Sequence, residues 1–234
     1  MYFGMFDPTI IILIPAMIFA FYAQTKVHSA YKTYAGVRNR NGITGAEAAR
    51  IILDHNGLES VSIEMTQGKL SDHYDPRKRI MRLSPQVYGE PSIASVSIAA
   101  HEAGHAIQHG KGYSPLKVRN AMVPVVSIAS NLSWPLLIIG ILISSAGYYS
   151  GGTLLFNLGI LLFVGVILFH AVTLPVEFNA SKRAVDQLIA LRIIREEERT
   201  SSKKVLSAAA MTYIAALAVA VSNLIRILAM RGRN

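Results

Sequence analysis

The sequence predicts a mainly α-helical membrane protein with about four transmembrane helices and a small α+β element outside the bilayer. Of its 234 residues, 52% are hydrophobic and only 16% are charged, against roughly 25% charged in an ordinary soluble domain. Residues 120–176 form a run of 57 positions without Asp, Glu, Lys or Arg. Because about 20 apolar residues cross a bilayer as a helix, this run alone is long enough for two spans.

The uncharged stretches define the expected spans. Residues 1–25 are predicted to form the first transmembrane helix, because basic residues follow the apolar stretch instead of preceding it as in a signal peptide. Residues 120–176 are predicted to form a hairpin of two helices that meet at the glycine-rich segment 147–152. Segment 205–234 is predicted to contain a fourth helix and a basic tail.

The positive charge predicts the orientation. Lys and Arg number 23 against 14 Asp and Glu, and 20 of the basic residues fall in segments 26–119 and 177–204. By the positive-inside rule these two segments face the cytoplasm, and the N-terminus and the 147–152 turn lie outside. The basic tail would lie outside if the fourth helix crossed completely, so the sequence leaves that crossing open. Basic residues separated by long uncharged runs favour a lipid bilayer over nucleic acid as the partner.

Segment 26–119 is long enough for a compact subdomain. Thr44 and Glu47 have the spacing of a capping box, which predicts a helix over 44–56. Three short runs at 61–65, 70–74 and 79–83 predict a small sheet or hairpin, with a turn at Asp75 and Pro76. A longer helix is predicted to begin after Pro91 and to end at Gly110. Segment 177–204 is predicted to be a cytoplasmic helix, with 196–198 forming a solvated acidic face.

The predicted helix that ends at Gly110 contains the pattern H-E-x-x-H at residues 101–105. At 100° per residue, His101 and His105 lie about 40° apart on one helix face, where both imidazoles can bind one ion. Glu102 projects beside them and is expected to act as the general base of hydrolysis. The chain has no cysteine, so a zinc site would use nitrogen and oxygen ligands only. The alternative is an amphipathic helix with two solvated histidines.

A hydrolytic zinc site generally has three protein ligands, so a third one must be found. The extended pattern with a third histidine fails, because Gln108 and Lys111 stand where its glycine and histidine would be. The intramembrane class needs an Asp-Gly pair, which the chain lacks. Glu177 is the first charge after the 57-residue run, and two spans separate it from His105, so both would emerge on the same face. The sequence therefore predicts Glu177 as the third metal ligand, with an interfacial or helix N-terminal acid as the alternative.

Other polar residues have weaker claims to a role. His109 would either hydrogen-bond an oxyanion or be solvated, and His73 and Tyr74 would either shape a cleft or belong to a loop. His170 is a polar residue within a predicted span, and Arg183 follows Glu177 by about two helical turns.

The stretches 71–76, 101–106 and 175–181 resemble the membrane-bound neutral zinc metallopeptidases of bacteria, the YugP-like group, over nearly the whole chain. The sequence is more distantly similar to the HtpX-like membrane proteases, in which the glutamate ligand begins an E-x-x-x-D motif and the aspartate supports a zinc histidine. Ser181 replaces that aspartate here, so the support would come from Asn179, Ser181 or Asp186. The resemblance implies a zincin-like element, a Zn²⁺ cofactor and peptidase activity of the gluzincin type.

These observations predict a zinc metalloendopeptidase of the bacterial cytoplasmic membrane, with its site facing the cytoplasm. His101, His105 and Glu177 would hold zinc, and Glu102 would take a proton from water and deliver it to the leaving amine. A strand edge within 61–83 would bind an extended peptide or membrane-protein substrate, and membrane-protein quality control is the suggested role by analogy. Two alternatives stay open, namely a catalytically silent membrane scaffold stabilised by metal and a zinc hydrolase of a non-peptide substrate.

Overall fold

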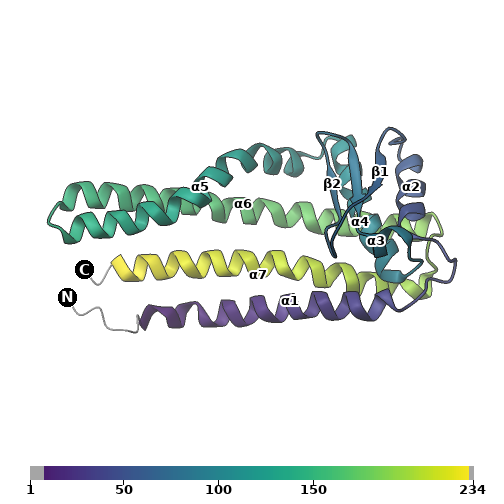
Figure 1. The fold of residues 1–234 in the computed structure, drawn as a ribbon, viewed down its shortest axis with the longest axis horizontal. Coiled ribbons are helices and arrows are strands. Elements are labelled where there is room, and N and C mark those ends of the chain that lie inside the picture. Colours follow the sequence, from purple (N-terminus) through teal and green to yellow (C-terminus); the bar gives the residue numbers. More distant parts are fainter. Residues whose placement is uncertain (1–7, 232–234) are drawn as a thin grey trace. The chain divides into compact units, whose positions relative to one another are not determined.

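The computed structural model describes residues 8–231, which are mainly helical (Figure 1). The elements in chain order are η1 (Pro8–Ile12), α1 (Ile14–Ala35), α2 (Gly45–His55), β1 (Ser62–Met65), β2 (His73–Asp75), β3 (Ile80–Leu83), α3 (Pro85–Gly89), α4 (Ile93–Gly110), α5 (Ser114–Ser145), α6 (Tyr149–Ala190), η2 (Glu196–Glu198) and α7 (Arg199–Arg231). The chain divides into two compact units. The first unit comprises residues up to 22, 118–173 and 213 onwards, and the second comprises 23–117 and 174–212.

Three helices of the described chain are long and apolar enough to cross a membrane. They are α5, α6 and the continuous stretch Glu196–Arg231 that ends with α7. In the first unit their outward side chains are apolar and exposed, as lipid-facing residues are, and Val125, Leu142 and Leu154 are each at least 60% exposed. The predicted turn between the two hairpin helices is confirmed, because α5 ends at Ser145 and α6 begins at Tyr149.

The predicted first span is not among these three helices. Residues 1–7 of that span lie outside the described residues, and residues 8–25 contribute η1 and the first half of α1. Helix α1 continues to Ala35 and includes Lys26 and Lys32, so only its first part is apolar. The described chain therefore supports three candidate spans, and a count of four stays a prediction.

Two arginines near the end of α7 have partners inside the first unit. The Arg231 guanidinium donates to Asn157 Oδ1 at 2.8 Å and lies 6.0 Å from the centre of the Phe156 ring. Arg226 Nε donates to Thr9 Oγ1 at 3.4 Å. The end of α7 thus lies beside the beginning of α6, which is the arrangement expected when both helices run the full length of this unit. Arg233 lies outside the described residues.

The second unit contains the small sheet and the helices around it. Its strand order is β1-β3-β2, with β1 parallel to β3 and β2 antiparallel to β3, so β1 and β2 are the edge strands. The predicted capping box of α2 is confirmed, since the Thr44 side chain accepts from the Glu47 amide and the Glu47 carboxylate accepts from the Thr44 amide. Ser92 caps α4, which begins and ends as its sequence signals predict.

Helix α4 is the centre of the core of this unit. Its fully buried positions pack with apolar side chains of α2, the sheet and the 174–212 segment, among them Ile52, Leu53, Met81, Leu83 and Leu188. Burying one such side chain contributes roughly 1.5–3 kcal/mol, so the core holds α4 firmly. Gly104 allows α4 to lie directly against α6, because a Cβ at this position would lie only 2.7 Å from the Ala180 carbonyl oxygen.

Segment 177–204 differs from its prediction in two ways. It is not a single separate helix, because α6 passes through Pro175 without interruption and continues to Ala190, before η2 and α7 follow. The prediction of a solvated acidic face at 196–198 is wrong for Glu198. This side chain is buried because its carboxylate accepts hydrogen bonds from the backbone amides of Arg40 at 2.9 Å and Arg195 at 2.8 Å, and these bonds replace its hydration.

Candidate metal centre

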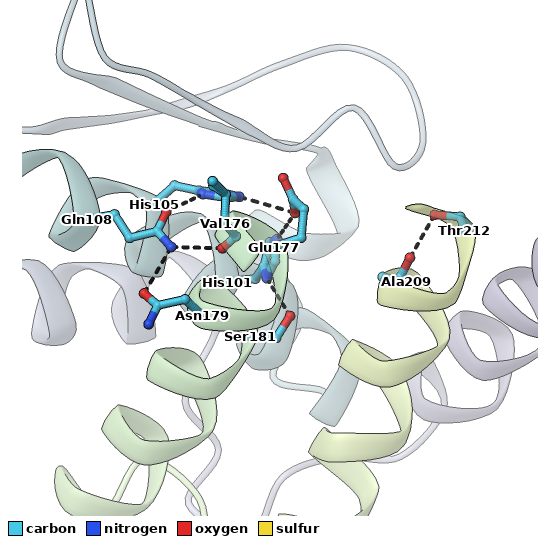
Figure 2. Close-up of polar contacts among 9 residues, drawn as sticks. All are labelled: His101, His105, Gln108, Val176, Glu177, Asn179, Ser181, Ala209 and Thr212. Carbon is cyan, nitrogen blue, oxygen red and sulfur yellow. Dashed lines mark hydrogen bonds and ion pairs between the residues drawn. The ribbon is translucent and has the colours of Figure 1, made fainter. Parts of the chain in front are cut away.

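Helices α4 and α6 bring three potential metal ligands together in the second unit. His101 and His105 lie one turn apart on α4, and Glu177 faces them from α6 (Figure 2). One potential ligand atom from each of these residues lies within 4.8 Å of the others. The structure thus unites the three side chains that the sequence singled out from positions up to 76 residues apart.

The two distances from the Glu177 carboxylate to the imidazole nitrogens suit a small tetrahedral ion. Glu177 Oε2 lies 3.2 Å from His101 Nε2 and 3.5 Å from His105 Nε2. Two ligands about 2.0 Å from a tetrahedral zinc ion are separated by about 3.3 Å, which matches both distances. The imidazole rings lie edge to face, with an interplanar angle of 83°. In this arrangement both Nε2 atoms face the same Glu177 oxygen. Two imidazole nitrogens and one carboxylate oxygen are a donor set that zinc accepts readily.

The electrostatics of the cluster also favour a cation. The Glu177 side chain is only 4% exposed, and a buried carboxylate is costly unless positive charge or hydrogen-bond donors compensate it. Burial alone lowers the pKa of His105, but the hydrogen bond to Glu177 and the negative charge of Glu102 outweigh burial and raise the pKa above its ordinary value. The negative groups around His105 therefore stabilise positive charge at this point.

Each histidine has a polar partner behind its ring. His101 Nδ1 lies 3.2 Å from Ser181 Oγ on α6, and His105 Nδ1 lies 3.0 Å from Gln108 Oε1 on its own helix (Figure 2). These contacts occupy the Nδ1 atoms and leave both Nε2 atoms directed at Glu177. Partners of this kind orient metal-binding histidines and fix their tautomer.

Glu102 is a buried carboxylate next to the cluster. It is 9% exposed, and its charge acts on both His105 and Asp72. Burial raises the pKa of Asp72, hydrogen bonds from the Ser84 amide and hydroxyl oppose this rise, and the charge of Glu102 adds to it. Glu102 thus lies beside the histidines with little access to solvent, in a position from which its carboxylate can act on a water next to them.

A tyrosine and a histidine form a second polar group beside α4. The Tyr74 hydroxyl of β2 lies 3.0 Å from His109 Nδ1, one helical turn beyond His105. Burial raises the pKa of Tyr74, with the positive charge of Arg79 opposing it, so the hydroxyl keeps its proton at neutral pH. Neither residue is simply solvated, and together they fasten an edge strand to the helix that carries the histidines.

The other polar residues that the sequence suggested lie at different distances from the cluster. His73 is exposed and bonds to the Ser71 carbonyl, Asp186 is exposed, and His170 lies in the first unit. Among the three suggested supports for a zinc histidine, Ser181 contacts His101 directly and Asn179 contacts Gln108. Sequence analysis missed Gln108 itself. The signal was available in a polar residue three positions after His105, adjoining an apolar helix face.

These features define a class: a mainly helical protein with helices of membrane-spanning length and a His, His, Glu cluster that suits zinc. The family described as "Putative neutral zinc metallopeptidase" matches residues 9–232, so the chain belongs to that family. The chain is 46% identical over 217 residues, 93% of each sequence, to the Bacillus subtilis (strain 168) protein named "Putative membrane protease YugP", and the predicted family resemblance is thereby confirmed. No solved structure matches the chain.

Proposed function

We propose that the protein is a membrane zinc endopeptidase whose metal is held by His101, His105 and Glu177. The observation that carries the proposal is the convergence of two imidazole Nε2 atoms on one buried carboxylate oxygen at 3.2 and 3.5 Å. Membership of a zinc metallopeptidase family and the name of the Bacillus subtilis relative support the same conclusion.

The residues around the metal would divide the chemistry between them. Zinc, when bound, would supply Lewis-acid polarisation of the attacking water and of the scissile carbonyl. Glu102 would accept a proton from the attacking water at its carboxylate and then deliver that proton to the leaving amine. The Tyr74 hydroxyl or the His109 imidazole would donate a hydrogen bond to the oxygen on which negative charge develops.

An extended peptide is the substrate shape that the site favours. Strand β2 is an edge strand that carries Tyr74, and Tyr74 contacts the same helix as the two histidines. An edge strand can pair with an extended peptide through main-chain hydrogen bonds and so hold a scissile bond in register. The charge distribution favours a cytoplasmic site at the inner membrane, and misassembled membrane proteins are the substrates that this location suggests.

Metal analysis and a peptidase assay on the same purified proteins test the proposal. Wild type is expected to contain about one zinc per chain, and His105→Ala and Glu177→Ala are expected to lose most of it. Glu102→Gln should keep zinc and lose at least about 100-fold in peptide cleavage, because it removes the general base alone. Glu59→Gln changes an exposed glutamate and should keep both properties.

The alternatives predict different results in these assays. A silent scaffold would bind zinc and cleave nothing in wild type. A hydrolase of another substrate class would cleave small esters or amides but not an unfolded membrane protein reconstituted in the same vesicles. Full peptidase activity in Glu102→Gln would contradict the proposed mechanism.

A further inference from the structure

Gln108 is a completely buried amide that links α4 to α6 next to the metal ligands. We propose that Gln108 is a positioning residue that locks His105 in the tautomer with its proton on Nδ1, and that an amide, not a carboxylate, is required there. The inference rests on the proposed zinc site. It adds the group that keeps the His105 Nε2 lone pair available for metal.

Three contacts determine which way the Gln108 amide faces. Its Oε1 lies 3.0 Å from His105 Nδ1, while its Nε2 donates to the Val176 carbonyl at 2.8 Å and to Asn179 Oδ1 at 3.0 Å (Figure 2). In the flipped orientation the amide oxygen would face the Val176 carbonyl oxygen, so two acceptors would oppose each other in a buried place. The contacts on α6 therefore fix Oε1 towards His105, and an oxygen that can only accept requires the proton on Nδ1.

The next residue in the series of hydrogen bonds fixes the same orientation independently. Arg183 Nε donates to Asn179 Oδ1 at 2.7 Å. An arginine can only donate, so Asn179 must present its oxygen to Arg183, and the same oxygen accepts from Gln108. The hydrogen bonds thus form a directional series that runs from Arg183 through Asn179 and Gln108 to His105. It starts at the Arg183 guanidinium, which is always a donor.

The same amide also positions the third ligand. The Val176 carbonyl that accepts from Gln108 belongs to the residue directly before Glu177. One buried side chain therefore fixes the ring of His105 and the backbone next to the Glu177 carboxylate. The two ligands lie on different helices 3.5 Å apart, and this link joins those helices directly beside both of them.

A carboxylate could not replace the amide, although carboxylates commonly support metal-binding histidines. Gln108→Glu would still accept from His105 Nδ1. It would also direct an unprotonated oxygen at the Val176 carbonyl and at Asn179 Oδ1, which are both acceptors. Asn179→Asp is the opposite case, because the Asp carboxylate can accept from both Gln108 and Arg183, as the amide oxygen does.

Zinc affinity and the His105 tautomer, both measured on the full-length protein in detergent, test the inference. Competition with a chromophoric chelator should show zinc binding at least about 10-fold weaker in Gln108→Glu and within about threefold of wild type in Asn179→Asp. Nitrogen NMR of the zinc-loaded protein should show Nε2 coordination and a protonated Nδ1 at His105 in wild type and in Asn179→Asp. Both substitutions conserve size, so a role in packing alone predicts no loss in either.

A second variant covers the case in which Gln108→Glu fails to fold, as judged by circular dichroism and thermal unfolding. Gln108→Met keeps the length of the side chain but removes its donors and its acceptor, and it should also weaken zinc binding about 10-fold. Wild-type zinc affinity in Gln108→Glu, or in Gln108→Met together with a retained Nδ1 proton signal, would overturn the inference. Absence of zinc binding in wild type would instead overturn the proposed function, so the two failures are distinguishable.

Discussion

Ser181 of α6 contacts the Nδ1 side of the His101 ring, with its hydroxyl oxygen 3.2 Å from Nδ1. This contact is long and uncharged, so we expect Ser181→Ala to weaken zinc binding by about 10-fold, at the lower end of the effect of losing such a partner. Ser181→Asp supplies a charged acceptor and is expected to bind zinc at least as tightly as wild type. Chelator competition measures both.

Ser207→Ala is the matched control for the Ser181 variants. Ser207 is exposed and its hydroxyl donates to the Lys204 carbonyl of its own helix, so its removal should leave zinc affinity unchanged. Equal zinc affinity in Ser181→Ala and wild type would show that His101 needs no partner at Nδ1.

The candidate ligands could be predicted because their signals do not depend on knowing the fold. His101, Glu102 and His105 follow from helical spacing, and Glu177 follows from its isolation as a charge after a long uncharged run. The support of His105 could be predicted only in part. The spacing of three residues between His105 and Gln108 is a local signal, but the contacts that orient the Gln108 amide lie 68 and 71 positions further along the chain, and no local pattern reports them.

Helices α4 and α6 meet at Gly104, between the two histidines. A methyl group there would lie 2.7 Å from the Ala180 carbonyl oxygen, which is backbone and cannot rotate away. We therefore expect Gly104→Ala to push the helices apart, to lower the free energy of unfolding by about 1–3 kcal/mol and to weaken zinc binding at least about 10-fold. Thermal unfolding and chelator competition measure the two effects.

Gly89→Ala is the control for the Gly104 variant. A Cβ at Gly89 meets no atom within 4 Å, so this substitution should be neutral or slightly stabilising. If Gly104→Ala behaved like Gly89→Ala, the close approach of α4 and α6 would not be needed for the site.

The elements with local signals were predicted, and those that depend on distant partners were not. The capping box of Thr44 predicted the start of α2, and the start of α4 was predicted directly after Pro91, where Ser92 caps the helix. The parallel pairing of β1 with β3 has no such signal, because it depends on which strands meet in space. The predicted membrane hairpin ends at residue 176, yet α6 continues through Pro175 to Ala190, and the turns around and after this proline contact α4.

For the molecule as a whole, composition predicted a membrane protein but not every span. Three helices of the described chain meet the length and composition of a span, and α1 does not, because its polar second half follows a short apolar one. In the sequence, the arginines of the tail are charges without visible partners, and for this reason the sequence leaves open whether α7 crosses the membrane completely. In the first unit Arg226 contacts Thr9, and Arg231 contacts Asn157 and the Phe156 ring. Such contacts reduce the free-energy cost of placing a charged side chain in a membrane-spanning helix.

The orientation of the chain in the membrane is the last prediction, and it follows from the basic residues in 26–119 and 177–204. The chain has no cysteine, so any single introduced cysteine reports its own accessibility. In intact cells, a membrane-impermeant maleimide should label Tyr148→Cys, in the exposed turn before α6. Lys78→Cys, in the exposed turn between β2 and β3, should be labelled only after permeabilisation. Wild type, which has no cysteine to label, is the negative control. The reverse labelling pattern would mean that the histidines of the second unit face the outside, and the substrates would then be exported rather than cytoplasmic segments.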